Sequence, residues 1–119
     1  MEFEQFTISL LIRRPDAPKL DEEQAAALQD AHMAHLADLH EAGHLLAAGP
    51  IAFDDPSEEL RGLSILRVDP KQARTLEEAD PAVRAGLYSI KTVHWMIPRG
   101  AVSFSATRFP RSVAEAATE

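Results

Sequence analysis

The fold of this chain is decided by residues 60–97, LRGLSILRVDPKQARTLEEADPAVRAGLYSIKTVHWMI. Residues 60–68 predict a strand, and side chains over residues 88–97 alternate with the period of a second β-strand. Between these two runs, Asp69-Pro70 and Asp80-Pro81 each place a helix-capping carboxylate before a proline suited to the first helical position. The stretch therefore predicts a strand, a helix to about residue 79, a short second helical segment to residue 86, and a strand.

The N-terminal half of the chain predicts the same order of elements, a strand, a helix and a strand. Residues 3–13 alternate in the same way and predict a strand, and the two prolines of residues 14–18 predict a loop. Asp21, with Gln24 three residues later, resembles a capping box that opens a long helix ending at Gly43. Residues 44–53 then predict a strand with a kink at Gly49-Pro50, followed by a turn at residues 54–57.

The predicted order is thus strand, helix, strand, strand, helix, strand. This is the ferredoxin-like βαββαβ arrangement of the α+β class, a four-stranded antiparallel sheet with two helices on one face because right-handed crossovers return both there. We expect residues 1–98 to form the domain and residues 99–119 to be a C-terminal appendage. Within the appendage, residues 101–106 are a strand candidate and residues 112–118 a helix candidate.

The predicted strands are apolar on both sides, which leaves the sheet face without helices to be accounted for. Leu63 and Ile65 oppose Leu66 and Val68 along one strand, for example. A bare apolar face of this size exceeds what soluble monomers usually expose. We therefore expect a homodimer in which a second copy covers this face, and the alternative is that the C-terminal appendage folds over it.

Composition narrows the function classes. The 119 residues suit one domain. Nineteen acidic against twelve basic residues give a net charge of −7, without the basic density that binds nucleic acid. No uncharged stretch approaches the length of a membrane span, and residues 1–4 do not resemble a signal peptide, so we expect a cytoplasmic protein with no membrane partner. Without cysteine, any chemistry must use His, carboxylate, hydroxyl, Arg, Lys or backbone groups.

Two histidines fall on the apolar stripe of the long predicted helix. At 100° per residue, His32 and His35 share a face with Leu28, Leu36 and Leu39. A buried imidazole requires hydrogen-bond partners, so His32 should meet a polar group from another element, either as a structural core histidine or as a functional one. No third ligand follows at a fixed spacing, so we expect no metal.

A carboxylate partner for His32 can come from either Asp-Pro pair. One oxygen of a capping aspartate accepts from the helix amides while the other can orient an imidazole, which fixes the tautomer and raises the basicity of the far nitrogen. Asp69 and Asp80 have the same local chemistry, and their spacing does not choose between them. Arg84, one turn past Asp80, could meet an anionic substrate or simply be solvated.

Two segments in this order resemble a known family. Residues 32–50, HMAHLADLHEAGHLLAAGP, and residues 79–87, ADPAVRAGL, are similar to the YCII-related (YciI-like) family, and the resemblance runs from about residue 3 to residue 98. It implies a dimeric α+β barrel whose active-site pair is one helix histidine and the aspartate of the Asp-Pro motif, here His32 and Asp80. The sequence departs from the family pattern at Gln29, where an arginine is frequent, and at His35, where an aromatic residue is frequent.

The resemblance also frames the function. One branch of the family removes chloride from a chlorinated hydroxyquinol, with the His-Asp pair implicated. We therefore expect a small enzyme that uses no metal or organic cofactor, with His32 and Asp80 as catalytic residues and His35, Arg84 and Pro50 contacting a small cyclic or aromatic ligand.

Two other readings stay open. One is a ligand-binding or accessory module with a structural His-Asp pair, and the other, by fold analogy, is a cofactor-free monooxygenase. A histidine nitrogen that opens into a cleft would favour catalysis, and a sealed histidine would favour a structural role.

Overall fold

The computed structural model describes residues 1–52, 54–55 and 58–118. Its elements, in chain order, are β1 (Phe3–Arg13), α1 (Glu22–Glu41), β2 (Leu45–Pro50), β3 (Leu60–Leu66), α2 (Pro70–Glu78), α3 (Pro81–Arg84), β4 (Tyr88–Pro98) and α4 (Val113–Ala116). Phe53 at the end of the predicted second strand, Pro56 and Ser57 of the predicted turn, and Glu119 lie outside the described residues. Within the described part of the chain, no helix combines the length and apolar character of a membrane span.

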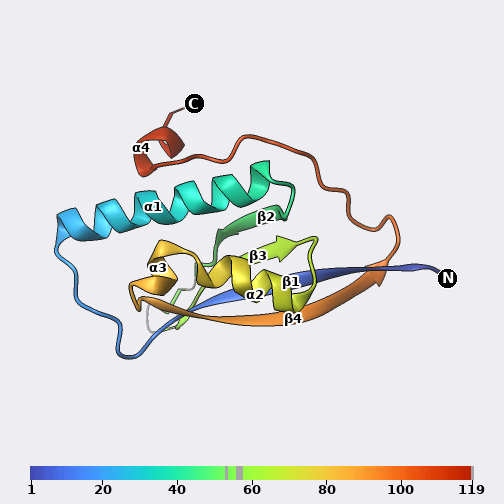
Figure 1. Cartoon of the computed structure of the whole chain (residues 1–119), viewed down its shortest axis with the longest axis horizontal. Helices are drawn as coiled ribbons and strands as arrows, with labels where there is room; N and C mark the ends of the chain where they lie inside the picture. Colours follow the sequence, from blue (N-terminus) through green and yellow to red (C-terminus); the bar gives the residue numbers. More distant parts are fainter. Residues whose placement is uncertain (53, 56–57, 119) are drawn as a thin grey trace.

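The four strands form one antiparallel sheet in the order β2-β3-β1-β4 (Figure 1). The central strand β1 pairs with both neighbours, so that Thr7 lies opposite Leu66 of β3 and His94 of β4. The predicted α+β class and ferredoxin-like arrangement are confirmed. The second strand is shorter than predicted, since its pairing with β3 ends where Pro50 lies opposite Gly62.

The core lies between the helices and one face of the sheet. Its buried centre consists of Leu39 from α1, Ala73 from α2, and Leu45 and Leu66 from the sheet. Because α1 and α2 contribute to the same cluster, both cover the same face. Burying a large apolar side chain stabilises the folded state by roughly 1.5–3 kcal/mol, so this cluster holds the helices against the sheet.

The signals that the sequence gives for the two ends of the long helix are present in the structure of α1. Asp21 accepts a hydrogen bond from the Gln24 amide at 2.7 Å, and the Gln24 side chain accepts from the Asp21 amide at 3.1 Å, so the capping box is present. Past the end of α1, the chain turns at Gly43 with φ of +83°, a conformation that glycine adopts without steric penalty. α1 therefore begins and ends close to where the sequence predicts.

The C-terminal segment differs from its prediction. Residues 101–106 form no strand, because the chain turns away from β4 at Gly100, whose φ is +86°, and has no ladder partner beyond Pro98. It crosses Phe6 of β1 through Phe104, with the ring centroids 5.3 Å apart. Figure 1 shows it continuing past β2 to α4, which lies against α1. The helix predicted at residues 112–118 is present as α4, and Ser112 is its N-cap.

The sheet face opposite α1 and α2 stays largely without a covering segment in this single chain. Phe6 is buried there by Trp95 and Phe104. Strand alternation places further side chains on the same face, all of them partly exposed: Ile8, Leu10, Ile12, Leu63, Ile65 and Val93. The C-terminal segment therefore covers one end of this face and then turns to the helix side.

Candidate active site

His32 and Asp80 meet in the layer between the helices and the sheet. His32 lies on α1, and its Nδ1–H donates to Oδ2 of Asp80 at 2.5 Å. The Asp80 side chain is completely buried and that of His32 is 13% exposed. A hydrogen bond at Nδ1 fixes the tautomer and leaves Nε2 as the proton acceptor of the neutral ring. Within the described part of the chain, Nε2 has no hydrogen-bond partner.

Asp80 uses its two oxygens for two tasks. Oδ1 accepts from the Ala82 amide at 2.8 Å and caps α3, while Oδ2 orients the imidazole. Asp69, the other candidate, is exposed, and its side chain accepts from the Gln72 amide at 2.8 Å. The structure thus distinguishes the two Asp-Pro pairs, which spacing could not, because Asp80 bonds His32 of α1 and Asp69 is exposed.

A cavity of about 580 Å³ opens beside this pair, within the size range of small-molecule sites. His32 and Pro50 are among its lining residues. Most of the lining is apolar, as in typical ligand sites, and it includes Leu11, Met33, Leu36, Ala48, Ile51 and Phe109. Polar groups are few and reach the cavity from the sheet and helices: Ser9, Gln29, Arg61, Ser64, Glu77 and Tyr88. The cavity therefore combines an apolar lining with polar side chains that can form hydrogen bonds.

The C-terminal segment forms one wall of the cavity through Phe109, Pro110 and Ala116. His40 anchors this wall: its Nδ1–H donates to the Leu45 carbonyl at 2.7 Å and its Nε2 accepts from the Thr107 amide at 3.1 Å. The His40 and Phe109 rings stack with centroids 4.1 Å apart. The sequence alone connected neither His40 nor the appendage with the site.

Glu77 is a buried ionisable group of this cavity that the sequence alone did not point to. It is 2% exposed, and its Oε1 is the single buried side-chain oxygen or nitrogen without a hydrogen-bond partner among the described residues. Burial raises the pKa of Glu77 to about 7, and the negative charge of Asp80 adds to the rise. The charge of His32 and a hydrogen bond from Ser64 act in the opposite direction. A buried carboxyl that titrates near neutrality is a feature of functional sites.

The family follows from the sequence match. Residues 8–97, most of the chain, match the model of the YCII-related domain. The chain belongs to the YCII-related domain family. No protein with a curated description matches the sequence.

Solved structures resemble this YCII-related domain in fold. One is 5-chloro-2-hydroxyhydroquinone dehydrochlorinase (TftG) from Burkholderia phenoliruptrix AC1100, in complex with 2,5-dihydroxybenzoquinone. It has a TM-score of 0.50 and 21% identity, and the likeness covers 80% of this chain and 95% of that chain. Another is SnoaB, a cofactor-independent oxygenase from Streptomyces nogalater, with a TM-score of 0.43, 12% identity, and coverage of 82% and 95%.

The remaining predicted contacts of the YCII-related domain lie apart from the cavity. Nε2–H of His35 donates to the Leu76 carbonyl at 2.9 Å, which ties α1 to α2. Arg84 is exposed at the end of α3. Neither residue lines the cavity, whereas Pro50 and Gln29 do. A substrate-binding role of His35 and Arg84 stays a prediction.

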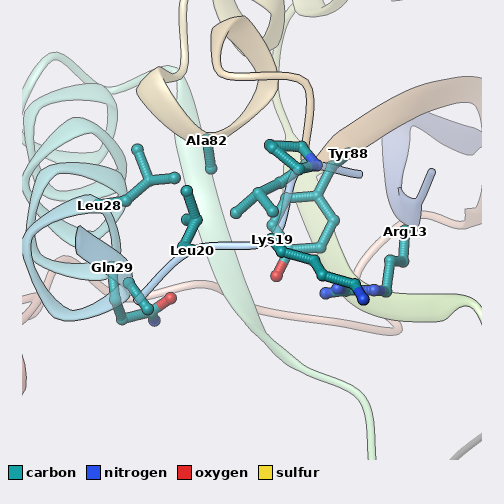
Figure 2. Close-up of a pocket in the computed structure, with 10 residues that line it drawn as sticks. Arg13, Lys19, Leu20, Leu28, Gln29, Ala82 and Tyr88 are labelled. Atoms are coloured by element: carbon teal, nitrogen blue, oxygen red, sulfur yellow. The ribbon is translucent and has the colours of Figure 1, made fainter. Parts of the chain in front are cut away.

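A second pocket of about 490 Å³ lies at the N-terminal end of α1 in this YCII-related domain. Figure 2 shows Leu20, Leu28 and Ala82 on one side of it and the basic side chains of Arg13 and Lys19 on the other. Its lining shares Gln29 and Tyr88 with the cavity beside His32, so the two pockets adjoin.

The side chains of this YCII-related domain can do acid-base chemistry. Nowhere in residues 1–52, 54–55 and 58–118 do three His, Asp or Glu side chains converge as a metal-ligand set. The groups that line the cavity beside His32 are an oriented imidazole, a carboxyl that titrates near neutrality, and hydroxyls. Such a set can take a proton from a bound molecule and return one.

Proposed function

We propose that this YCII-related protein is a small enzyme that moves a proton on a small cyclic or aromatic substrate, in the manner of a lyase or dehydrochlorinase and with no metal or organic cofactor. One observation carries the proposal: Asp80 holds Nδ1 of His32, and the His32 ring lines a mostly apolar cavity. His32 is the proton-transferring base and Asp80 its positioning partner. A sealed histidine with both nitrogens bonded to protein would have favoured a structural role.

The chemistry follows from the hydrogen-bond directions. Asp80 accepts from both the Ala82 amide and the imidazole, so it stays an acceptor and fixes the neutral ring with its lone pair on Nε2. When Nε2 takes a proton, the buried carboxylate stabilises the imidazolium that forms. Positioned acid-base groups contribute roughly 10²–10⁴-fold to a rate.

Two features support the substrate class. The cavity has room for a ring of modest size, and its apolar side chains favour a flat hydrocarbon body. TftG, which shares this fold, is named for a dehydrochlorination of a hydroxyquinol and was solved with a hydroxyquinone. We therefore place cyclic enols, phenols and hydroxyquinones first among candidate substrates.

Proton transfer can be tested without knowing the final product. A panel of small cyclic enols, phenols and hydroxyquinones is incubated in D₂O with the wild type, His32→Asn and His94→Asn, and deuterium incorporation is followed by ¹H NMR. His94 is exposed on β4 and serves as the control. We expect exchange in the wild type and in His94→Asn, and a loss of about 10²–10⁴-fold in His32→Asn. Equal deuterium exchange with the wild type and both variants would contradict the hypothesis of an enzyme and favour a ligand-binding module.

We also propose that a second copy of the chain covers the open sheet face and forms a homodimer. Support comes from the partly exposed apolar side chains around Ile65 and Ile8, since an apolar patch of this kind marks an interaction surface. Sedimentation velocity tests this. Ile65→Glu should give a monomer, whereas Met96→Glu, on the opposite side of the sheet and already 63% exposed, should not change the mass. A monomeric wild type would contradict the proposal.

A further inference from the structure

Glu77 is a buried acid that the fold alone does not require. It lies on α2 one helical turn after Ala73, which is completely buried in the core, so an apolar side chain would fit the same face. A buried carboxyl oxygen without a partner costs free energy that an apolar residue would not. Its side chain lines the same cavity as His32. The cost is offset if a bound molecule supplies the missing partner.

We propose that Glu77 is a second catalytic residue of the cavity: its protonated carboxyl gives a proton to a carbonyl or phenolate oxygen of the substrate while His32 takes a proton from the ring. This rests on the proposed function of His32 and narrows the substrate to a ring that carries such an oxygen beside an acidic C–H or O–H. Glu77 can serve as the donor because burial and the charge of Asp80 raise its pKa to about 7, which keeps much of it protonated at neutral pH.

The step balances without an oxidant or reductant. For a cyclic ketone, Nε2 of His32 takes the proton of a ring C–H, and the electron pair of that bond becomes the C=C bond of the enol. The electron pair of the carbonyl moves to oxygen, which takes the proton of Glu77. The protein then holds an imidazolium and a carboxylate in place of a neutral imidazole and a neutral acid, so its net charge is unchanged.

The electrostatics couple the two transfers. A positive charge on His32 lowers the pKa of Glu77, so a proton that arrives on His32 favours the departure of the proton from Glu77. The charged or titratable groups around the cavity are His32 from α1, Asp80 at the start of α3, Arg61 from β3 and Tyr88 from β4. Ser64 of β3 also hydrogen-bonds the Glu77 carboxyl. Of these, His32 and Asp80 set the coupling that the proposal uses.

The test compares Glu77→Gln with Glu78→Gln, its exposed neighbour on α2. In the deuterium-exchange assay, the rate of the wild type should fall above about pH 7, where Glu77 loses its proton. Glu77→Gln should lower kcat/KM at least tenfold and should not show this fall. Glu78→Gln should behave as the wild type. An unchanged rate with an unchanged alkaline fall in Glu77→Gln overturns the role of Glu77 and leaves that of His32 standing. No loss in His32→Asn removes the proposed function itself.

A binding measurement decides the matter where no panel compound exchanges. The probe is 2,5-dihydroxybenzoquinone, titrated by calorimetry at pH 6 and pH 9. We expect its affinity to fall at least tenfold from pH 6 to pH 9 in the wild type and in His32→Asn, because an ionised Glu77 repels a quinone oxygen. The affinity of Glu77→Gln should not depend on pH in this range. The same fall in Glu77→Gln, or no binding to the wild type, overturns the proposal.

Discussion

Replacing Glu77 by glutamine should make the protein more stable, and increasingly so as the pH rises. In the unfolded chain this carboxyl has its ordinary pKa of 4.5, and burial raises it to about 7 in the folded protein. The unfolded state therefore releases its proton first. The contribution of Glu77 to stability is full below pH 4.5 and is lost as the pH rises through 7. The pKa difference of about 2.5 corresponds to roughly 3.5 kcal/mol of unfolding free energy, at about 1.4 kcal/mol for each pKa unit.

Urea unfolding at fixed protein concentration, followed by far-UV circular dichroism between pH 4 and pH 8, measures this effect. The quantity of interest is the unfolding free energy of Glu77→Gln minus that of the wild type, in which the other titrating groups largely cancel. We expect it to increase by roughly 3 kcal/mol over this range. The same difference for Glu78→Gln, whose carboxylate is 53% exposed, should be nearly flat. A difference in unfolding free energy for Glu77→Gln that does not change with pH would refute the raised pKa of the buried Glu77 carboxyl.

Three further perturbations follow from the contacts described. In Asp80→Asn the side chain can still cap α3, but an amide that faces Nδ1 of His32 favours the wrong imidazole tautomer. Deuterium exchange should therefore fall about 10²–10⁴-fold while the circular dichroism spectrum stays unchanged. Full exchange would exclude a positioning role of Asp80. Thr7→Val leaves the Val68 carbonyl without the 2.6 Å hydrogen bond from the Thr7 hydroxyl, and should lower the unfolding free energy by about 1–3 kcal/mol in urea titrations; no change would mean that another group satisfies this carbonyl. Ending the chain after Pro98 should leave a folded domain with a lower thermal midpoint. This shortened chain should also bind 2,5-dihydroxybenzoquinone more weakly, because the cavity wall that includes Phe109 is lost. An unfolded product would contradict the proposed division of the chain into a domain, residues 1–98, and an appendage, residues 99–119.

Most strands and helices could be predicted from residues that are close together in the sequence. Alternation predicted β1 and β4, and the pairs Asp21 with Gln24 and Asp69 with Pro70 predicted where α1 and α2 begin, because these signals depend on neighbours in sequence. Residues 101–106 carry a weak strand pattern and form no strand. A strand needs a hydrogen-bonding neighbour, and the turn after Pro98 takes the chain away from β4.

Part of the site could be predicted as well. The apolar stripe of α1 indicated that His32 needs a polar partner, and the family resemblance named Asp80. Glu77 was missed because a glutamate on a short helix is ordinarily exposed. Its signal was present in the spacing, since Ala73 and Glu77, at i and i+4, share one face of α2 and both are buried. The role of Phe109 in the cavity wall depends on long-range packing, which no local pattern encodes.

The tautomer of His32 tests the central claim most directly. Long-range ¹H–¹⁵N NMR of the histidine-labelled protein, at a pH where the ring is neutral, reports which nitrogen carries the proton, and His32→Asn assigns the signals. With Nδ1–H donating to Asp80, we expect a protonated Nδ1, an unprotonated Nε2, and a shift of the Nε2 resonance when 2,5-dihydroxybenzoquinone is added. A ring protonated at Nε2, or an Nε2 signal that does not respond to the quinone, would contradict His32 as the base of this cavity.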